Sequence, residues 1–206
     1  MELPRYFTNY EKDIVRDQNF LKAKHDIIEK VHQLFSVFQE NLRKDLTNNP
    51  PVPQLPCDLQ SGKISKGDNY ENMPWLISDY PRIFSRKRVF AFRVLFWWGH
   101  HFSFNFHLQG DLLHEYRQVL ENNLDDIIDK GYFICCGDSP WDYNFETPNF
   151  IQLNTANLNQ SKEIAREHEF IKIAKQIPVN STYEEITMQG RHTFDEFLIW
   201  AGHIRK

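Results

Sequence analysis

The segment RVFAFRVLFWWGHHFSFNFHLQGD, Arg88–Asp111, decides the fold. It contains two runs rich in aromatic residues that meet at Gly99-His100-His101, and ring and polar residues alternate along the second run. Alternation with a period of two is typical of a β-strand. Two such runs joined by a short glycine-containing turn predict an antiparallel β-hairpin.

The length of the hairpin loop determines which side chains share a face, because directly opposed residues point to the same side of a sheet. A three-residue loop, Gly99-His100-His101, separates the side chains by kind, as half-buried antiparallel sheets do. A two-residue turn, Gly99-His100, would mix both faces and stays open, since glycine at its first position suits a type II′ turn. With the three-residue loop, one face is entirely apolar and holds Phe90, Phe92, Val94, Phe96, Trp98, Phe102, Phe104, Phe106 and Leu108. The other face holds Arg93, Leu95, Trp97, Ser103, Asn105 and His107.

Composition limits the class of protein. Of the 206 residues, 41% are hydrophobic and 15% are aromatic, enough for one sizeable core. The net charge of -4, with both signs interspersed, argues against the basic surface that binding to nucleic acid normally needs, so no nucleic-acid partner is expected. No apolar run approaches the roughly 18 residues of a membrane span, so no membrane partner is expected. Three cysteines, of which Cys135 and Cys136 are adjacent, favour reduced thiols and a cytoplasmic protein.

The residues before the hairpin predict a helix, a long loop and a short strand. Apolar residues recur at three- and four-residue spacing within residues 11–46, which indicates an amphipathic helix with at most one break. Residues 47–72 contain four prolines and two glycines and predict a long irregular connection. A short strand is expected at Trp75–Ser78, ended by Tyr80-Pro81.

The residues after the hairpin predict further helices and two short strands. Asp111 is a plausible helix N-cap, because apolar residues at helical spacing follow it. Short buried strands are expected at 132–136 and 150–153, and a helix at 161–176. Two capping boxes predict further helix starts: Thr182 with Glu185, and Thr193 with Glu196.

Together these elements predict a single α+β domain spanning residues 1–206. A small antiparallel sheet built around the 88–109 hairpin would be packed by N-terminal, central and C-terminal helices. No glycine-rich phosphate loop, serine elbow, His-Glu-x-x-His or Cys-x-x-Cys motif occurs in the chain. Function therefore has to be inferred from the faces of the sheet.

The polar face of the hairpin is the candidate ligand-binding surface, because a few convergent polar groups beside apolar ones are typical of a pocket. Residues 47–72 or the segment SPWDYNF, 139–145, would form its edge. The alternative is that this face is simply the solvated side of an antiparallel sheet. The predicted lining residues are Trp75, Arg93, Trp97, Asn105 and His107.

His107, Asp111 and His114 come closest to metal-ligand spacing, at the junction of a strand and a helix. A role as helix N-cap already accounts for Asp111 at this position, and His114 falls on the face of its helix that is expected to be exposed to solvent. No bound metal is therefore predicted. His107 is the best candidate for a catalytic acid or base. Cys135 and Cys136 are interpreted as small buried hydrophobic residues rather than nucleophiles.

Basic residues cluster just before and within the hairpin: Arg82, Arg86, Lys87, Arg88 and Arg93. Arginine forks match carboxylate and phosphate groups, so this cluster could clamp an anion, although a short charged connection before a strand is the favoured explanation.

The sequence favours a protein that binds a small ligand, which could be anionic, on the polar and aromatic face of the hairpin. Two alternatives stay open: an enzyme that uses His107 as acid–base or metal ligand, and a protein-interaction module whose exposed aromatic residues contact a partner. No motif assigns a cofactor, a reaction or an oligomeric state.

Overall fold

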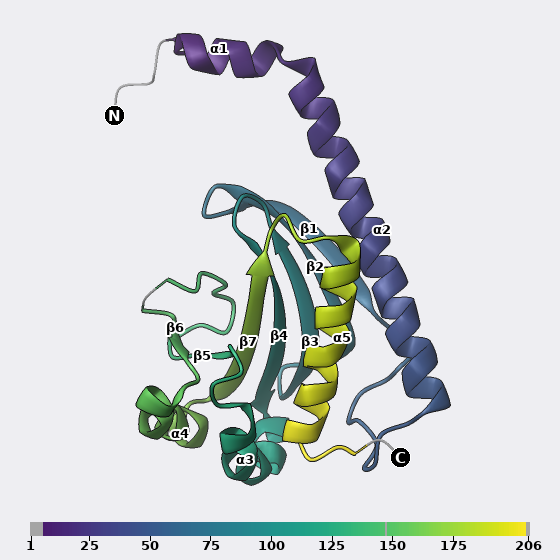
Figure 1. The fold of residues 1–206 in the computed structure, drawn as a ribbon, viewed down its shortest axis with the longest axis vertical. Helices are drawn as coiled ribbons and strands as arrows, with labels where there is room; N and C mark the ends of the chain where they lie inside the picture. Colours follow the sequence, from purple (N-terminus) through teal and green to yellow (C-terminus); the bar gives the residue numbers. More distant parts are fainter. Residues whose placement is uncertain (1–5, 147, 205–206) are drawn as a thin grey trace.

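The computed structural model describes residues 6–146 and 148–204, which form an α+β fold around one open, seven-stranded antiparallel sheet (Figure 1). The strands follow the order β1-β2-β3-β4-β7-β5-β6 across the sheet. They are β1 Lys63–Tyr70, β2 Met73–Phe84, β3 Arg88–Trp97, β4 His101–Gly110, β5 Phe133–Cys135, β6 Phe150–Gln152 and β7 Phe170–Pro178. The helices are α1 Asn9–Arg16, α2 Gln18–Asn48, α3 Asp111–Asn123, α4 Leu158–Glu167 and α5 Tyr183–Trp200, with short 3-10 helices at Leu124–Ile127 and Thr155–Asn157.

The central hairpin has a three-residue loop, as predicted, but the loop is displaced by one position. Trp97 lies opposite His101, so the loop consists of Trp98, Gly99 and His100, and His101 begins β4. Gly99 supplies the left-handed backbone in the middle of this loop, with φ +76°. Because the loop still has an odd number of residues, the predicted separation of apolar and polar faces is confirmed for the strand residues.

The apolar face of the sheet forms the main core with the helices. Helices α2, α3 and α5 contact strands β2, β3 and β4, and Figure 1 shows α2 and α5 lying across one side of the sheet. The ring of Phe92 illustrates the packing, since its centroid lies 5.0 Å from that of Phe194 and 6.4 Å from that of Phe38. Gly190 of α5 lets the helix approach closely, because a Cβ there would lie 2.7 Å from Phe104 Cε1.

The predicted N-terminal helix is confirmed as two helices with one break, at Asp17. The Asp17 side chain accepts hydrogen bonds from the backbone N–H groups of Asn19 and Phe20 and so caps the start of α2. In α2 the buried residues begin at Val31. No helix in residues 6–146 and 148–204 combines the length and the apolar character that crossing a bilayer requires.

Two predictions made for the region before the hairpin are corrected. Residues 47–72 are not irregular throughout, because β1 occupies the last part of this segment and pairs with β2. The strand expected at Trp75–Ser78 is longer, since β2 continues to Phe84. It passes Tyr80-Pro81 through a β-bulge between Asp79 and Arg82, and a bulge tolerates a residue that has no N–H to donate.

Predictions for the region after the hairpin are confirmed in part. The short strands and the capping box of Thr182 are confirmed by β5, β6 and the start of α5. The helix expected at 161–176 is wrong, because α4 ends at Glu167 and the next residues form β7 between β4 and β5. Thr193 lies inside α5 and starts no helix. Asp111 is the first residue of α3 rather than its cap, and Gly110 takes the N-cap position without a side-chain hydrogen bond.

Candidate functional site

The polar face of the sheet carries an ion pair between neighbouring strands. Asp79 of β2 lies opposite Arg93 of β3, and Arg93 Nε and Nη2 donate to the two Asp79 carboxylate oxygens at 2.6 and 2.9 Å. Arg93 Nη1 donates to the hydroxyl of Tyr143, which lies between β5 and β6. The described residues of this segment, 136–146 and 148–149, are here called the cover loop. Burial lowers the pKa of Arg93, but the interactions with Asp79 and Tyr143 together outweigh it and raise the pKa above its usual value. The guanidinium therefore stays charged in the interior, and its hydrogen bonds to Asp79 and Tyr143 compensate for its burial.

Two further contacts hold the cover loop against the sheet. The backbone N–H of Tyr143 donates to the hydroxyl of Tyr70 at 2.8 Å. Lys172 Nζ donates to the carbonyl of Pro140 at 3.0 Å and to the carbonyl of Asp142, and it lies 3.8 Å from the centre of the Tyr143 ring. The cover loop is thus held by a cation on β3, a cation on β7 and a hydroxyl at the end of β1.

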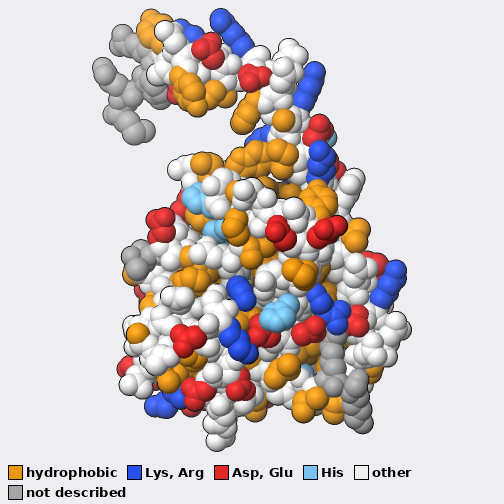
Figure 2. All heavy atoms as spheres, in the orientation of Figure 1, with side chains coloured by type: hydrophobic (Ala, Val, Ile, Leu, Met, Phe, Trp, Pro, Cys, Tyr) orange, Lys and Arg blue, Asp and Glu red, His pale blue; other side chains and the backbone are white. Residues whose placement is uncertain are grey.

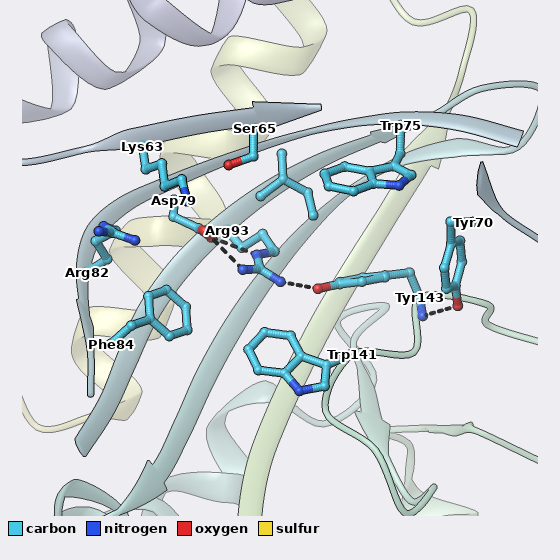
Figure 3. A pocket seen from close by; sticks show the side chains of 11 residues that line it. Lys63, Ser65, Tyr70, Trp75, Asp79, Arg82, Phe84, Arg93, Trp141 and Tyr143 are labelled. Atoms are coloured by element: carbon cyan, nitrogen blue, oxygen red, sulfur yellow. Dashed lines mark hydrogen bonds and ion pairs between the residues drawn. The ribbon is translucent and has the colours of Figure 1, made fainter. Parts of the chain in front are cut away.

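A cavity of about 480 Å³ lies between the cover loop and strands β1–β3. This volume falls within the range of small-molecule sites. Figure 3 shows Lys63, Arg82 and Phe84 toward one end, and Tyr70, Trp75 and Tyr143 toward the other. Five rings line the cavity, Tyr70, Trp75, Phe84, Trp141 and Tyr143, together with Lys63, Ser65, Ile77, Asp79, Arg82 and Arg93.

The bulge in β2 and a glycine in β1 shape this cavity. The register of β2 against β3 shifts by one residue between Asp79 and Arg82, so both side chains point to the polar face although they are three residues apart. Without the shift, Arg82 would face the helices. Gly67 lies opposite Trp75, and a Cβ at Gly67 would lie 2.6 Å from the indole ring, so the missing side chain leaves room for Trp75.

A layer of buried polar side chains lies beneath the cover loop. Burial lowers the pKa of His101 to about 4 and that of His107 to about 3. Burial also lowers the pKa of Lys172 to about 7. Asn105 Nδ2 donates to Ser103 Oγ at 3.0 Å, whereas the Nε2 atoms of His101 and His107 have no hydrogen-bond partner among the described residues. At neutral pH both imidazoles are therefore neutral, and Lys172 loses its proton far more readily than an exposed lysine does.

The structure brings two of the five predicted ligand-binding residues into the cavity. Trp75 and Arg93 line it, and they come from adjacent strands. Trp97 is buried behind the cavity wall, where its ring centroid lies 5.0 Å from that of Tyr70 and its indole N–H donates to the Tyr70 carbonyl. Trp97 thus supports a lining residue and does not line the cavity itself.

The other two predicted residues, Asn105 and His107, lie in the buried layer. The ring of His107 packs edge-on beneath Trp141, with the centroids 5.5 Å apart. Ser103, Asn105 and His107 are at most 4% exposed, so the interpretation of this face as solvated is wrong for these residues. The SPWDYNF segment covers part of this layer, because Trp141 packs on His107 and Phe145 packs on His101.

Within the part of the chain that the structure describes, no group of three His, Cys, Asp or Glu side chains is arranged to hold a metal ion. His107, Asp111 and His114 therefore do not form the metal site considered from their spacing. His114 instead lines a separate hollow beside α3, together with Arg117. Cys135 is buried, and burial raises the pKa of its thiol, which makes it a poor nucleophile.

The sequence patterns did not reveal two residues that shape the site, Asp79 and Lys172. Asp79 lies just beyond the predicted end of its strand, and its pairing with Arg93 depends on a register that no local pattern shows. Lys172 fell inside a predicted helix. The alternation of isoleucine in FIKIAKQIP, 170–178, was the available signal, since it indicates a strand with Lys172 on the opposite face.

Comparison of the chain with models of known protein families, with curated proteins and with solved structures finds no match.

Proposed function

We propose that this protein binds a flat aromatic molecule that carries a carboxylate or phosphate group, in the cavity between the cover loop and strands β1–β3. The observation that carries the proposal is the polarity of the cavity. The rings of Tyr70, Trp75 and Tyr143 lie toward one end, and Lys63 and Arg82 lie with the ring of Phe84 toward the other (Figure 3). Neither cation forms an ion pair with another described residue.

The balance of charge favours an anionic group on the ligand. Three cations and one carboxylate line the cavity, and the carboxylate, Asp79, is already paired with Arg93. Lys63 and Arg82 are therefore the uncompensated charges. An arginine fork matches the geometry of a carboxylate or phosphate, and a hydrogen bond to a charged group contributes about 1.5–3 kcal/mol.

The rings favour a flat apolar body on the same ligand. Aromatic pairs in edge or offset contact gain about 0.5–1.5 kcal/mol beyond the area they bury. Trp141 is 48% exposed although it lines the cavity, so a bound ring would remove part of its apolar surface from water.

The test compares a matched pair of probes, 2-naphthoate and its neutral amide 2-naphthamide, by calorimetric titration of the full chain. We expect 2-naphthoate to bind more tightly, and Arg82→Gln to weaken it about 10–100-fold, the effect of losing one charged hydrogen bond. The same variant should leave 2-naphthamide binding unchanged. The control is Lys66→Gln, since Lys66 lies on β1 but outside the cavity.

Absence of binding by both probes, or equal weakening by Arg82→Gln and Lys66→Gln, would overturn the proposal. Equal affinity for the two probes would retain an aromatic site but reject the anionic group.

A further inference from the structure

The N-terminal arm, residues 6–23, extends away from the sheet (Figure 1). Every residue in this range is exposed, and α1 contains no buried residue. Figure 2 shows hydrophobic side chains on α1 and open space between α1 and the rest of the molecule. The arm therefore buries none of its side chains in the core that holds the sheet and the other helices.

The exposed side chains of the arm are unusually apolar for a surface. Tyr6 is 87% exposed and Tyr10 is 74% exposed. Scattered apolar residues on a surface need no explanation, but a contiguous set marks an interaction site. The other large apolar members of the arm are Phe7, Ile14, Val15, Phe20 and Leu21.

These residues follow the spacing of a helix face that packs against something. Phe7, Tyr10 and Ile14 recur at three- and four-residue spacing, which places them along one side of α1 and its first flanking turn. In α2, Leu21 is followed seven and fourteen residues later by Ile28 and Phe35. Phe35 belongs to the buried core and Ile28 is partly buried against it, so this row of side chains is covered further along α2 and exposed at its start.

An isolated helix as short as α1 is marginal in water. Thr8 and Glu11 form a capping box at its start, which contributes on the order of 1 kcal/mol, less than the cost of ordering the helix. Covering the apolar face would supply the missing stabilisation, since burying one large apolar side chain contributes about 1.5–3 kcal/mol.

We propose that the arm is a dimerisation surface whose occupant is the arm of a second copy of this chain. The charges of the arm fit a like partner, because three acidic and three basic side chains give it no net charge. Two arms then do not repel each other, and the arm has no basic excess to draw it to anionic lipid or nucleic acid. The charged residues are Glu11, Lys12, Asp13, Arg16, Asp17 and Lys22.

The area available also suits a symmetric pair. An aromatic side chain presents about 150–250 Å², so the exposed parts of Tyr6, Phe7, Tyr10 and Phe20 amount to roughly 500 Å². A two-fold pair doubles this to about 1,000 Å² before the aliphatic side chains are counted, which approaches the 1,200–2,000 Å² of stable interfaces.

The test measures the mass of the full chain in solution by sedimentation equilibrium over a range of concentrations. We expect a dimer that dissociates on dilution. The double variant Tyr10→Ser/Phe20→Ser should raise the dimer Kd by at least about 100-fold, as the loss of central aromatic contacts does in other interfaces. Met188→Ser is the matched control, because Met188 is an exposed apolar residue on α5, outside the arm.

Circular dichroism and the Tm of the double variant establish that the sheet remains folded. Dimerisation of the double variant with the wild-type Kd would overturn the proposal, and so would a monomeric wild type at every concentration. Binding of the monomer to vesicles of neutral or anionic phospholipid, in place of self-association, would assign the arm to membranes. Neither variant should alter 2-naphthoate binding, so this test is independent of the proposed ligand site.

Discussion

Replacing Lys172 by methionine should remove much of the dependence of stability on pH near neutrality. The Lys172 side chain is 1% exposed and makes no salt bridge with a described carboxylate. Its ammonium group is bound by the carbonyls of Pro140 and Asp142 and by the ring of Tyr143. Burial lowers the pKa of Lys172 from 10.5 to about 7 in the folded chain.

The sign of the effect follows from proton binding. Between pH 7 and 10.5 the unfolded chain holds the Lys172 proton and the folded chain has released it, so the free energy of unfolding increases with pH. Integrated from pH 6.5 to pH 8.5, this contribution is about 2 kcal/mol. Below pH 7 the buried charge costs about 5 kcal/mol, from 1.36 kcal/mol per unit of pKa.

Methionine has a similar length and no charge, so its burial is independent of pH. It also leaves the carbonyls of Pro140 and Asp142 without this donor, at about 1–3 kcal/mol each. At pH 6.5 these lost hydrogen bonds destabilise the variant, whereas removal of the buried charge stabilises it. The test therefore compares how the free energy of unfolding changes with pH, not its value at one pH.

The assay is urea denaturation of wild type and Lys172→Met at pH 6.5, 7.5 and 8.5. Histidines and cysteines that titrate in this range are common to both proteins and cancel in the difference. We expect the wild type to gain about 2 kcal/mol more than the variant over this range. Lys66→Met, which removes an exposed lysine on β1, should retain the wild-type dependence. Parallel pH profiles for wild type and Lys172→Met would refute the reasoning.

Three further changes have defined outcomes. Because burial lowers the pKa of His107 to about 3, stability should fall as pH drops below 6.5, and His107→Phe should reduce that fall in acid denaturation followed by circular dichroism. Asp79→Asn leaves the buried Arg93 charge without its partner, and urea denaturation should show a loss of about 3–5 kcal/mol. Gly67→Ala forces the indole of Trp75 to move, so calorimetry should show weaker 2-naphthoate binding than in the wild type, with the sheet still folded.

The two faces of the central hairpin could be predicted from the sequence because they depend only on parity. Any loop with an odd number of residues puts Phe92 on the same face as Phe106, and Arg93 on the same face as Asn105. The predicted loop was displaced by one position, and this error left the set of strand residues on each face unchanged. The capping box at Thr182 was equally local, since both of its hydrogen bonds lie within one turn.

The rest of the fold depends on contacts between distant segments. Residues 170–178 carry helix formers and isoleucines together, and pairing with β4 selects the strand. The bulge that turns Arg82 toward the cavity has no local signature beyond Pro81. The cover loop takes its place through Tyr70, Arg93 and Lys172, which lie far from it in sequence.

The alternation of ring and polar residues in β4 predicted a polar face correctly, but a polar face of a sheet need not be exposed to solvent. His101, Asn105 and His107 are buried, although polar alternation usually indicates a side open to water. The difference arises because the cover loop is itself polar where it meets the sheet. Its carbonyls accept from Lys172 and the hydroxyl of Tyr143 accepts from Arg93, so two cations can be buried beneath it without losing all their hydrogen bonds.

The same arrangement explains where the cavity lies. Over β4 and β7 the cover loop is drawn against the sheet by Lys172, and that part of the face is filled by the loop. Over β1 and β2 no such cation draws the loop down, and Gly67 leaves room for Trp75 to form a wall. The cavity is thus the portion of the polar face that the loop leaves uncovered, and Lys63 and Arg82 are charges there that no described side chain neutralises in an ion pair.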